Sequence, residues 1–510
     1  MARAALRGKQ KCCNPLRSHL HARNVCRVFY PEQRGLPVAA NVSFLQDLLN
    51  TIAEQGRQLL PSALVGGARE DITMLAEALV SVRGEASGVA IARQVLEFYR
   101  AMGPDERRGY FRFLAEHFKP DQEAVVAAAK AYLAAPSDQT LQRLRAATES
   151  PRQELFRRLN LAPGGTAEIV AMRRDMLRLP KAEPSLAAVD ADIAHLLTSW
   201  FNRGFLVVKR IDWQTPAAIL EKIIQYEAVH EIQGWDDLRR RLDPVDRRCF
   251  AFFHPSLIDE PLIFVEVALM SDIPGSIQTV LNEKRKGGPK EAAPTTAVFY
   301  SISNCQEGLR GISFGNFLIK QVVEELVREQ PQLKTFVTLS PVPHFARWLD
   351  RALANEQANA ITDADRVALQ VLRDPGWLED PEEEEAPKDT LLALAAHYFM
   401  LAKSADGRPV DPVARFHLGN GARLERINWL GDVSEKGLRE AHGLMVNYRY
   451  DLKEIERNHE VYANDGEVVT SRAVRTLLRA PAKPKPKAIE HQPSADKTKD
   501  DKKARSKTAE

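Results

Sequence analysis

The hydrophobic pattern of this chain changes its period near residue 180, and that change limits the folds it can adopt. Between about residues 42 and 178, apolar side chains recur every three or four positions, as in "FLQDLLNTIAEQGRQLL" and "AIARQVLEFYRAM". This spacing is typical of helices that bury one face. Pro and Gly fall between these segments rather than inside them, so the pattern predicts about eight helices in a domain at residues 41–180.

A different pattern follows "PKAEPSLAAVDADI", a stretch that we expect to be a linker. Short segments rich in β-branched and aromatic residues alternate with helical patterns, and these segments are "GFLVVKRI", "RCFAFFHP", "PLIFVEVALM", "TAVFYSIS" and "KTFVTL". Strands that alternate with helices indicate a mixed sheet covered by helices. We therefore predict the α+β class, with chemistry in a second domain at residues 190–475.

The two ends of the chain differ from both domains in composition. Residues 1–31 contain seven Lys or Arg and no acidic residue, and we expect residues 1–40 to form a basic unstructured tail. Residues 480–510 are rich in Lys, Pro and Ala, so this tail has too few large apolar residues to fold. The basic start is consistent with a targeting segment or with an over-extended start. We expect a cytoplasmic protein, with the mitochondrial matrix as the alternative.

The overall composition excludes several classes of function. Lys and Arg total 71 against 68 Asp and Glu, and a formal charge of +3 over 510 residues gives no reason to expect nucleic acid or an anionic membrane as a partner. Apolar runs are too short for a membrane-spanning helix. The five cysteines have no zinc-finger spacing, so reduced thiols are expected and no metal site is predicted. A cluster of Cys12, Cys13 and Cys26 with nearby histidines is disfavoured because the segment is otherwise structureless.

A glycine-rich loop stands between a predicted strand and a predicted helix in "TAVFYSISNCQEGLRGISFGNFLIKQVVEELVRE". Gly308, Gly311 and Gly315 allow a ligand to approach the backbone, and a helix that begins after such a loop presents free N–H groups to a phosphate. Arg310 adds a positive charge to the loop. The spacing matches neither a P-loop nor a dinucleotide-binding loop, and a plain structural turn remains the alternative.

Ser340 ends the next predicted strand, in "KTFVTLSPVPHF". Ligands of open α/β sheets collect at the carboxyl ends of strands, which places this hydroxyl on the same edge as the glycine-rich loop. The alternative is a cap on the following helix, but Pro341 and Pro343 intervene and make that distance a poor fit. No Gly-x-Ser-x-Gly elbow surrounds Ser340, which disfavours an ordinary hydrolase nucleophile.

His417 is the candidate partner of this serine. It precedes a Gly-Asn-Gly turn in "VARFHLGNGARLERINWLGD", so we expect it to project from the end of a strand into a cleft. A structural histidine is the alternative, and His254 and His344 are rival candidates.

Two long segments identify a family resemblance. "SISNCQEGLRGISFGNFLIKQVVEELVREQPQLKTFVTLSPVPHFARWL" and "ARFHLGNGARLERINWLGDVSEKGLREAHGLMVNYRY" resemble malonyl-CoA decarboxylases, and the resemblance extends from about residue 42 to about residue 455. It implies a helical oligomerisation domain followed by a catalytic domain similar in fold to the GNAT acyltransferases. It also implies a homotetramer built as a dimer of dimers.

The resemblance carries specific residues. It implies that CoA is contacted by Arg310, Gly311, Ile312, Ser313, Phe314, Gly315 and Asn316, and that the essential serine and histidine are Ser340 and His417. Ser313 stands where some relatives have an acidic residue. The implied reaction converts malonyl-CoA to acetyl-CoA and CO2, in malonyl-CoA and fatty-acid metabolism. No cofactor is expected, because the thioester itself accepts the electron pair.

We hypothesise that His417 donates the proton to the enolate and that Ser340 acts as a hydrogen-bonding acceptor or relay. Two other functions remain open from the sequence. An acyltransferase would deliver the acyl group to an amine, and a silent CoA-binding scaffold would bind without turnover.

Overall fold

The computed structural model describes residues 38–58, 71–81, 84–180, 183–282, 293–312, 314, 318–355, 361–374 and 376–479. The predicted tails at residues 1–40 and 480–510 lie outside these ranges, apart from residues 38–40 at the start of the first helix. The chain divides into two compact units, Met1–Asp47 and Leu48–Glu510. Helix α1, Val38–Gln58, crosses the boundary between them, and all that follows concerns the second unit.

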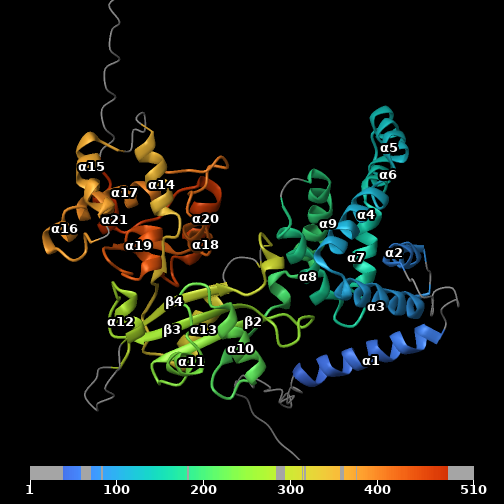
Figure 1. The fold of residues 1–510 in the computed structure, drawn as a ribbon, viewed down its shortest axis with the longest axis horizontal. Helices are drawn as coiled ribbons and strands as arrows, with labels where there is room; N and C mark the ends of the chain where they lie inside the picture. The colour runs from blue at the N-terminus through green and yellow to red at the C-terminus, as the bar shows by residue number, and fades with distance from the viewer. Residues whose placement is uncertain are drawn as a thin grey trace, which may run out of the picture. The chain divides into compact units, whose positions relative to one another are not determined.

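Helices account for the first part of the described chain (Figure 1). After α1 come α2 (Ile72–Ser81), α3 (Glu85–Ala101), α4 (Pro104–His117), α5 (Gln122–Ala134), α6 (Asp138–Thr148), α7 (Pro151–Leu159) and α8 (Gly165–Leu177). The helical pattern in the sequence is therefore confirmed over this region. Tyr99, Phe111 and Phe156 are fully buried among these helices.

The expected linker after Leu179 is wrong for most of its length. Helix α9 runs from Pro184 to Trp200 and buries Leu186, Val189, Ile193 and Leu197 at helical spacing. Pro184 occupies the first turn, where its missing N–H would have no partner within the helix and its fixed φ suits the start. The proline thus begins a helix rather than a linker.

The second part contains one mixed sheet of eight strands: β1 (Val207–Ile211), β2 (Arg247–Phe253), β3 (Pro261–Met270), β4 (Thr296–Asn304), β5 (Thr335–Thr338), β6 (Ser340–Pro341), β7 (Arg423–Asn428) and β8 (Met445–Tyr450). Strands β1 to β4 form an antiparallel series, and β4 pairs in parallel with β5. β8 pairs antiparallel with β5, β6 and β7. A helical region followed by a mixed sheet confirms the predicted α+β class.

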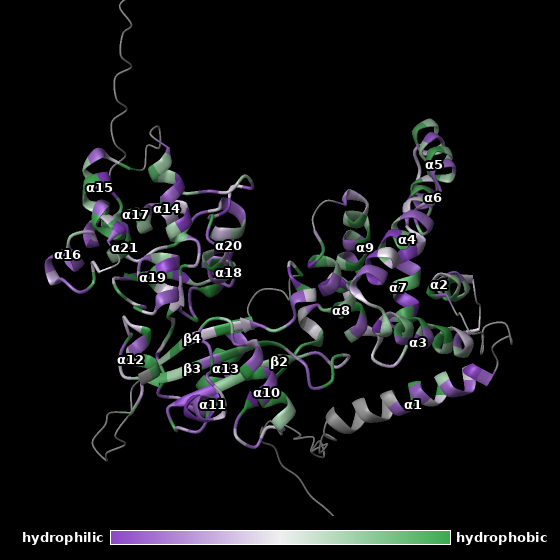
Figure 2. Ribbon diagram, in the orientation of Figure 1, coloured by the Kyte–Doolittle hydropathy of each residue, from purple (hydrophilic) through white to green (hydrophobic). Residues whose placement is uncertain are grey.

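Short and long helices surround this sheet. They are α10 (Ala217–Tyr226), α11 (Trp235–Leu242), α12 (Ile277–Asn282), α13 (Leu318–Glu329), α14 (Phe345–Ala354), α15 (Asp363–Ala368), α16 (Pro381–Glu385), α17 (Lys388–Met400), α18 (Pro412–Gly419), α19 (Glu435–Ala441), α20 (Ile455–Asp465) and α21 (Arg472–Leu477), with 3-10 turns η2 (Arg203–Phe205), η3 (Glu307–Leu309) and η4 (Leu369–Arg373). Figure 1 shows α10, α11 and α13 beside strands β2 to β4, and Figure 2 shows the hydrophobic residues of these strands. β2 and β3 are buried at every position, so both faces of the sheet are covered there. Among the described residues, no helix has the length and apolar composition needed to cross a membrane.

Strands β5 and β6 pair with successive parts of β8, and this pairing is interrupted at Leu339. The pairs Phe336–Tyr450 and Ser340–Val446 lie on either side of the break. The registered pairing of β4 with β5 ends at Phe299 and Thr338, whereas β4 continues to Asn304 beside β3. The sheet therefore opens beyond β5, and Ser340 lies where it opens.

Gly308 in η3 packs closely against α8, where the helical part of the chain meets the sheet part. The Arg173 Nη1 atom in α8 donates to the Gly308 carbonyl oxygen at 2.7 Å and to the Arg310 carbonyl oxygen at 2.9 Å. A Cβ atom on Gly308 would lie 2.8 Å from the Val170 carbonyl carbon in α8 and would overlap its oxygen. Because the obstruction is backbone, it cannot rotate away, and only glycine fits here without displacing the η3 turn.

We predict that Gly308→Ala destabilises the fold, because the added methyl group forces η3 away from α8. The expected loss is about 1–3 kcal/mol in the free energy of unfolding, the usual cost of overpacking. A lower denaturant midpoint on chemical unfolding checks this.

The matched control is Gly109→Ala in α4, where the added methyl group would have no neighbouring atom within 4 Å. This variant should be unchanged or more stable by about 0.5–1 kcal/mol, because alanine favours the helix interior. Equal midpoints for Gly308→Ala and wild type would contradict the close contact.

Candidate functional site

Ser340 and His417 lie in contact although they are 77 residues apart in the chain. The Ser340 Oγ atom is 3.2 Å from the His417 Nε2 atom. The exposed fractions of the two residues are 5 % and 3 %. The two residues singled out from the sequence thus form one buried pair.

His417 does not project from a strand end, contrary to the prediction. It lies in the last turn of α18, and the following Asn420 is the C-cap of this helix. The Gly-Asn-Gly segment ends a helix rather than a strand, with Gly421 in the left-handed region at φ 82°. The helix starts at the buried Asp411, whose carboxylate accepts from the Ala414 N–H at 2.7 Å and from the Tyr398 hydroxyl at 3.1 Å.

The Ser340 hydroxyl belongs to β6 and caps no helix. His344 is the N-cap of α14 and makes no side-chain capping hydrogen bond, so the capping role considered for Ser340 is excluded. Ser340 Oγ donates to Thr338 Oγ1 at 2.8 Å, and Thr338 Oγ1 also accepts from the Tyr448 N–H at 3.0 Å. The serine is therefore held from β5 and β8 together.

The hydrogen bonds around His417 indicate which of its nitrogens carries the proton. The Tyr450 hydroxyl lies 2.8 Å from His417 Nδ1. Burial raises the pKa of Tyr450 well above its usual value, so the phenol keeps its proton. Since Ser340 gives its own proton to Thr338, the bond to His417 uses Nε2–H as donor, and Nδ1 accepts from Tyr450. The result is a chain of donors from Tyr450 through His417 and Ser340 to Thr338.

The imidazole of His417 is neutral at neutral pH. Burial lowers its pKa to about 3, because the surroundings disfavour the charged ring. The ring also stacks on Tyr448, with centroids 4.6 Å apart and planes 23° apart. Both hydrogen-bond partners of the ring are hydroxyl groups, so the pair forms an uncharged, desolvated proton-handling centre.

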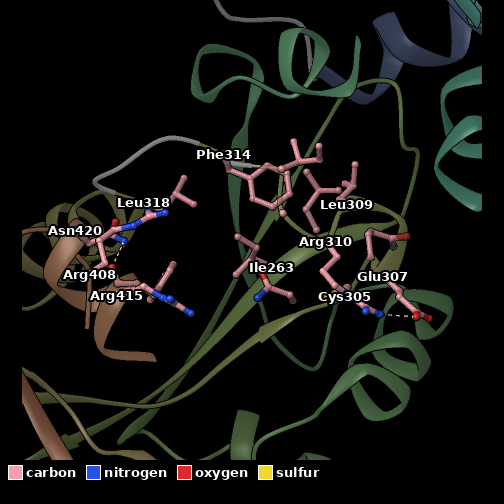
Figure 3. A pocket seen from close by; sticks show the side chains of 17 residues that line it. Ile263, Cys305, Glu307, Leu309, Arg310, Phe314, Leu318, Arg408, Arg415 and Asn420 are labelled. Atoms are coloured by element: carbon pink, nitrogen blue, oxygen red, sulfur yellow. Dashed lines mark hydrogen bonds and ion pairs between the residues drawn. The ribbon is translucent and has the colours of Figure 1, made fainter. Parts of the chain in front are cut away.

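A cavity of about 600 Å³ is lined in part by residues of α18, the helix that carries His417 (Figure 3). Its lining includes four of the seven loop residues predicted to bind the ligand: Arg310, Gly311, Ile312 and Phe314. Ser313, Gly315 and Asn316 lie outside the described residues. The other wall includes Arg415, Phe416, Gly419 and Asn420 from the helix that carries His417. His417 directly follows Phe416 and its ring contacts the Phe416 ring, but neither Ser340 nor His417 is part of the lining.

The glycine-rich loop is held by ionic contacts with the helical part. Glu307 accepts from the Arg178 Nε atom at 2.8 Å and from the Arg310 Nη2 atom at 2.6 Å. The Arg310 side chain is therefore engaged within the loop, although the sequence suggested it as a free anion-binding charge. Gly311 has φ 80°, a conformation that favours glycine.

Neither rival histidine belongs to the pair formed by Ser340 and His417. His254 Nε2 lies 3.1 Å from the Trp200 carbonyl oxygen, and its ring lies against Phe201 at 4.6 Å. His344 begins α14, as described above. Among the described residues, no group of three His, Cys, Asp or Glu side chains could hold a metal ion. Cys12, Cys13 and Cys26 lie outside them.

Sequence reasoning missed Thr338, Tyr448, Tyr450 and Asp411. Tyr448 and Tyr450 are two residues apart in "NYRY", the period that places strand side chains on one face of a sheet. That alternation was a usable signal for β8, but no local pattern showed that this face meets His417.

Comparison with known sequences places the described region from residue 118 onward in one family. The family model of the malonyl-CoA decarboxylase C-terminal domain matches residues 204–488, and that of the malonyl-CoA decarboxylase N-terminal domain matches residues 118–201. A protein of Anser anser anser named "Malonyl-CoA decarboxylase, mitochondrial" is 36 % identical over 353 residues, which are 64 % of this chain and 70 % of the relative. The protein of that name from Rattus norvegicus is 36 % identical over 360 residues, which are 66 % and 73 %.

Solved structures agree with this placement. The crystal structure of malonyl-CoA decarboxylase from Rhodopseudomonas palustris is 55 % identical, has a TM-score of 0.76, and is matched over 79 % of this chain and 98 % of its own. The crystal structure of malonyl-CoA decarboxylase from Agrobacterium vitis is also 55 % identical with a TM-score of 0.76, over 81 % and 100 %.

Proposed function

The chain belongs to the malonyl-CoA decarboxylase family, and from this premise we propose that it converts malonyl-CoA to acetyl-CoA and CO2 with Ser340 and His417 at the reacting carbon. The observation that supports this most strongly is the buried Ser340–His417 hydrogen bond, whose histidine lies on the helix that lines a cavity together with the glycine-rich loop. The pathway expected from the resemblance is malonyl-CoA and fatty-acid metabolism.

The proposed reaction breaks one carbon–carbon bond. The bond between the α-carbon and the carboxylate breaks, CO2 leaves, and the electron pair moves into the thioester to give an enolate. A proton then joins the α-carbon to give acetyl-CoA, and the donor regains a proton from solvent. Because the thioester accepts the electron pair, we propose that the chemistry calls for no metal, biotin or pyridoxal group.

The structure suggests how the pair assists. A neutral imidazole that carries its proton on Nε2 can donate a hydrogen bond to an enolate, and its Nε2 atom lies 3.2 Å from the Ser340 Oγ atom. Fixed hydrogen-bond donors in a buried site stabilise developing charge without reorganisation. The negative charge of the bound substrate favours the protonated ring, so His417 takes up a proton from solvent as an imidazolium, gives one proton to the α-carbon and returns to its neutral form. We propose His417 as proton donor and Ser340 as relay or acceptor.

We propose that CoA enters through the cavity. Leu309, Ile312 and Phe314 supply apolar surface for the pantetheine arm. The family resemblance assigns CoA contact to the loop from Arg310 to Asn316. The backbone N–H groups at the start of α13, which follows this loop, favour an anion such as a phosphate.

The assembly expected from the resemblance is a homotetramer arranged as a dimer of dimers. The hairpin of α5 and α6 buries none of its own residues and leaves Val126 51 % and Leu133 78 % exposed; Figure 2 shows the hydrophobic residues along α5. We propose this surface as one subunit contact. Light scattering should give four chains per particle, and a monomeric mass in dilute solution would contradict the proposal.

The proposed location is the cytoplasm, with the mitochondrial matrix as the alternative. The curated relatives above carry the word mitochondrial in their names, and the basic segment that bears on the question lies outside the described residues. Fractionation of cells that express the full chain, followed by detection with an antibody, decides between the two.

We predict that Ser340→Ala and His417→Asn each lower the rate of acetyl-CoA formation by about 10²- to 10⁴-fold, the usual contribution of a positioned proton-transfer group. The assay supplies malonyl-CoA alone, without an acceptor, and methylmalonyl-CoA serves as the comparison substrate. An acyltransferase would need an acceptor and would form no acetyl-CoA under these conditions, and a scaffold would bind without turnover.

The matched controls are Ser185→Ala and His195→Asn on the exposed side of α9. Both should keep the wild-type rate. Near wild-type rates for the Ser340 and His417 variants, with unchanged circular dichroism, would rule out the proposed roles.

A further inference from the structure

Arg415 extends from α18 toward the cavity, and it has no charged partner among the described residues. It lines the cavity together with Arg310 and Arg408. Figure 3 shows Arg415 and Arg408 approaching from the α18 side, and Arg310 with Glu307 from the opposite side. The charge of Arg415 is therefore available inside a space that the proposed function assigns to CoA.

The other two arginines of this lining each form an ion pair with a carboxylate. Arg310 binds Glu307, as described above. Arg408 binds Asp406 through Nε at 2.7 Å and through Nη2 at 2.6 Å, and the Ser404 hydroxyl together with these contacts holds the pKa of Asp406 well below its usual value. The loop residues outside the described ranges, 313 and 315–317, are Ser, Gly, Asn and Phe, so none adds a carboxylate.

Arg415 and His417 belong to the same helix, α18, but Arg415 lines the cavity whereas His417 contacts Ser340. Arg415 and Gly419 are four residues apart and share one face of the helix, and both line the cavity. His417 is buried and contacts Ser340. One helix therefore presents an unpaired guanidinium to the ligand space and an imidazole to the reacting pair.

We propose that Arg415 binds a phosphate group of the CoA moiety and so selects CoA thioesters over thioesters that lack the nucleotide. Guanidinium binds phosphate through two parallel N–H donors, which gives directional recognition as well as charge. The inference rests on the proposed function for the identity of the ligand. Under this proposal, α18 selects the substrate together with the glycine-rich loop on the opposite wall of the cavity.

The test compares Arg415→Gln with wild type in two measurements. Calorimetry with CoA itself should show a dissociation constant about 10- to 100-fold higher in the variant, the effect of losing one charge-assisted hydrogen-bond pair. In kinetic assays, kcat/KM for malonyl-CoA should fall by a similar factor through KM, while kcat/KM for malonyl-pantetheine stays at the wild-type value.

One shorter ligand, 3′-dephospho-CoA, identifies the phosphate. If the loss disappears when calorimetry is done with 3′-dephospho-CoA, the partner is the 3′-phosphate. If the loss persists with 3′-dephospho-CoA, the partner is the pyrophosphate. Either result supports the proposal, and Arg415→Lys should recover part of the affinity because it keeps the charge without the second donor.

Arg472→Gln is the matched control, since Arg472 is exposed at the start of α21 and does not line the cavity. It should leave both measurements unchanged. Equal affinity of Arg415→Gln and wild type for CoA would overturn the inference. If wild type binds CoA but forms no acetyl-CoA, the proposed function fails while the calorimetric comparison still decides the role of Arg415.

Discussion

Strand β8 is the element on which the candidate site depends, because it fixes both members of the reacting pair. Its Val446 pairs with Ser340, and its Tyr450 hydroxyl lies 2.8 Å from His417. The Asn447 Nδ2 atom donates to the Thr338 carbonyl oxygen at 2.7 Å, which holds the chain just before Ser340. Ser340 and His417 are 77 residues apart in the chain. Strand β8 brings them into contact, because it pairs with Ser340 and hydrogen-bonds to His417.

Burial determines the protonation state of His417 in this pair. In an aqueous setting His417 would titrate near neutral pH, but desolvation keeps its ring neutral and its hydrogen bonds direct its proton toward Ser340. A neutral donor needs no counter-ion, so the site can remain desolvated until a charged substrate arrives. The apolar surroundings that lower the imidazole pKa also strengthen its interaction with an anion.

Much of the arrangement follows from local patterns in the sequence, and the rest depends on contacts between distant segments. Helical spacing predicted α1 to α8, and short β-rich runs predicted β1 to β5, because each pattern reflects a face buried by neighbouring elements. The predictions at Pro184 and at the Gly-Asn-Gly segment after His417 are wrong because both residue types occur at helix ends as well as in loops. Ser340 and His417 were named from the sequence, but their contact and the role of Tyr450 arise from pairing along β8, which no local pattern encodes.

The central claim is that Ser340 and His417 act as one unit in forming acetyl-CoA. A double-mutant cycle tests it most directly, with kcat/KM measured for wild type, Ser340→Ala, His417→Asn and the double variant on malonyl-CoA alone. Groups that act together lose their joint effect when either is removed, so the double variant should be about as slow as the slower single variant. Losses that multiply in the double variant would show that the two residues act independently and would contradict this account.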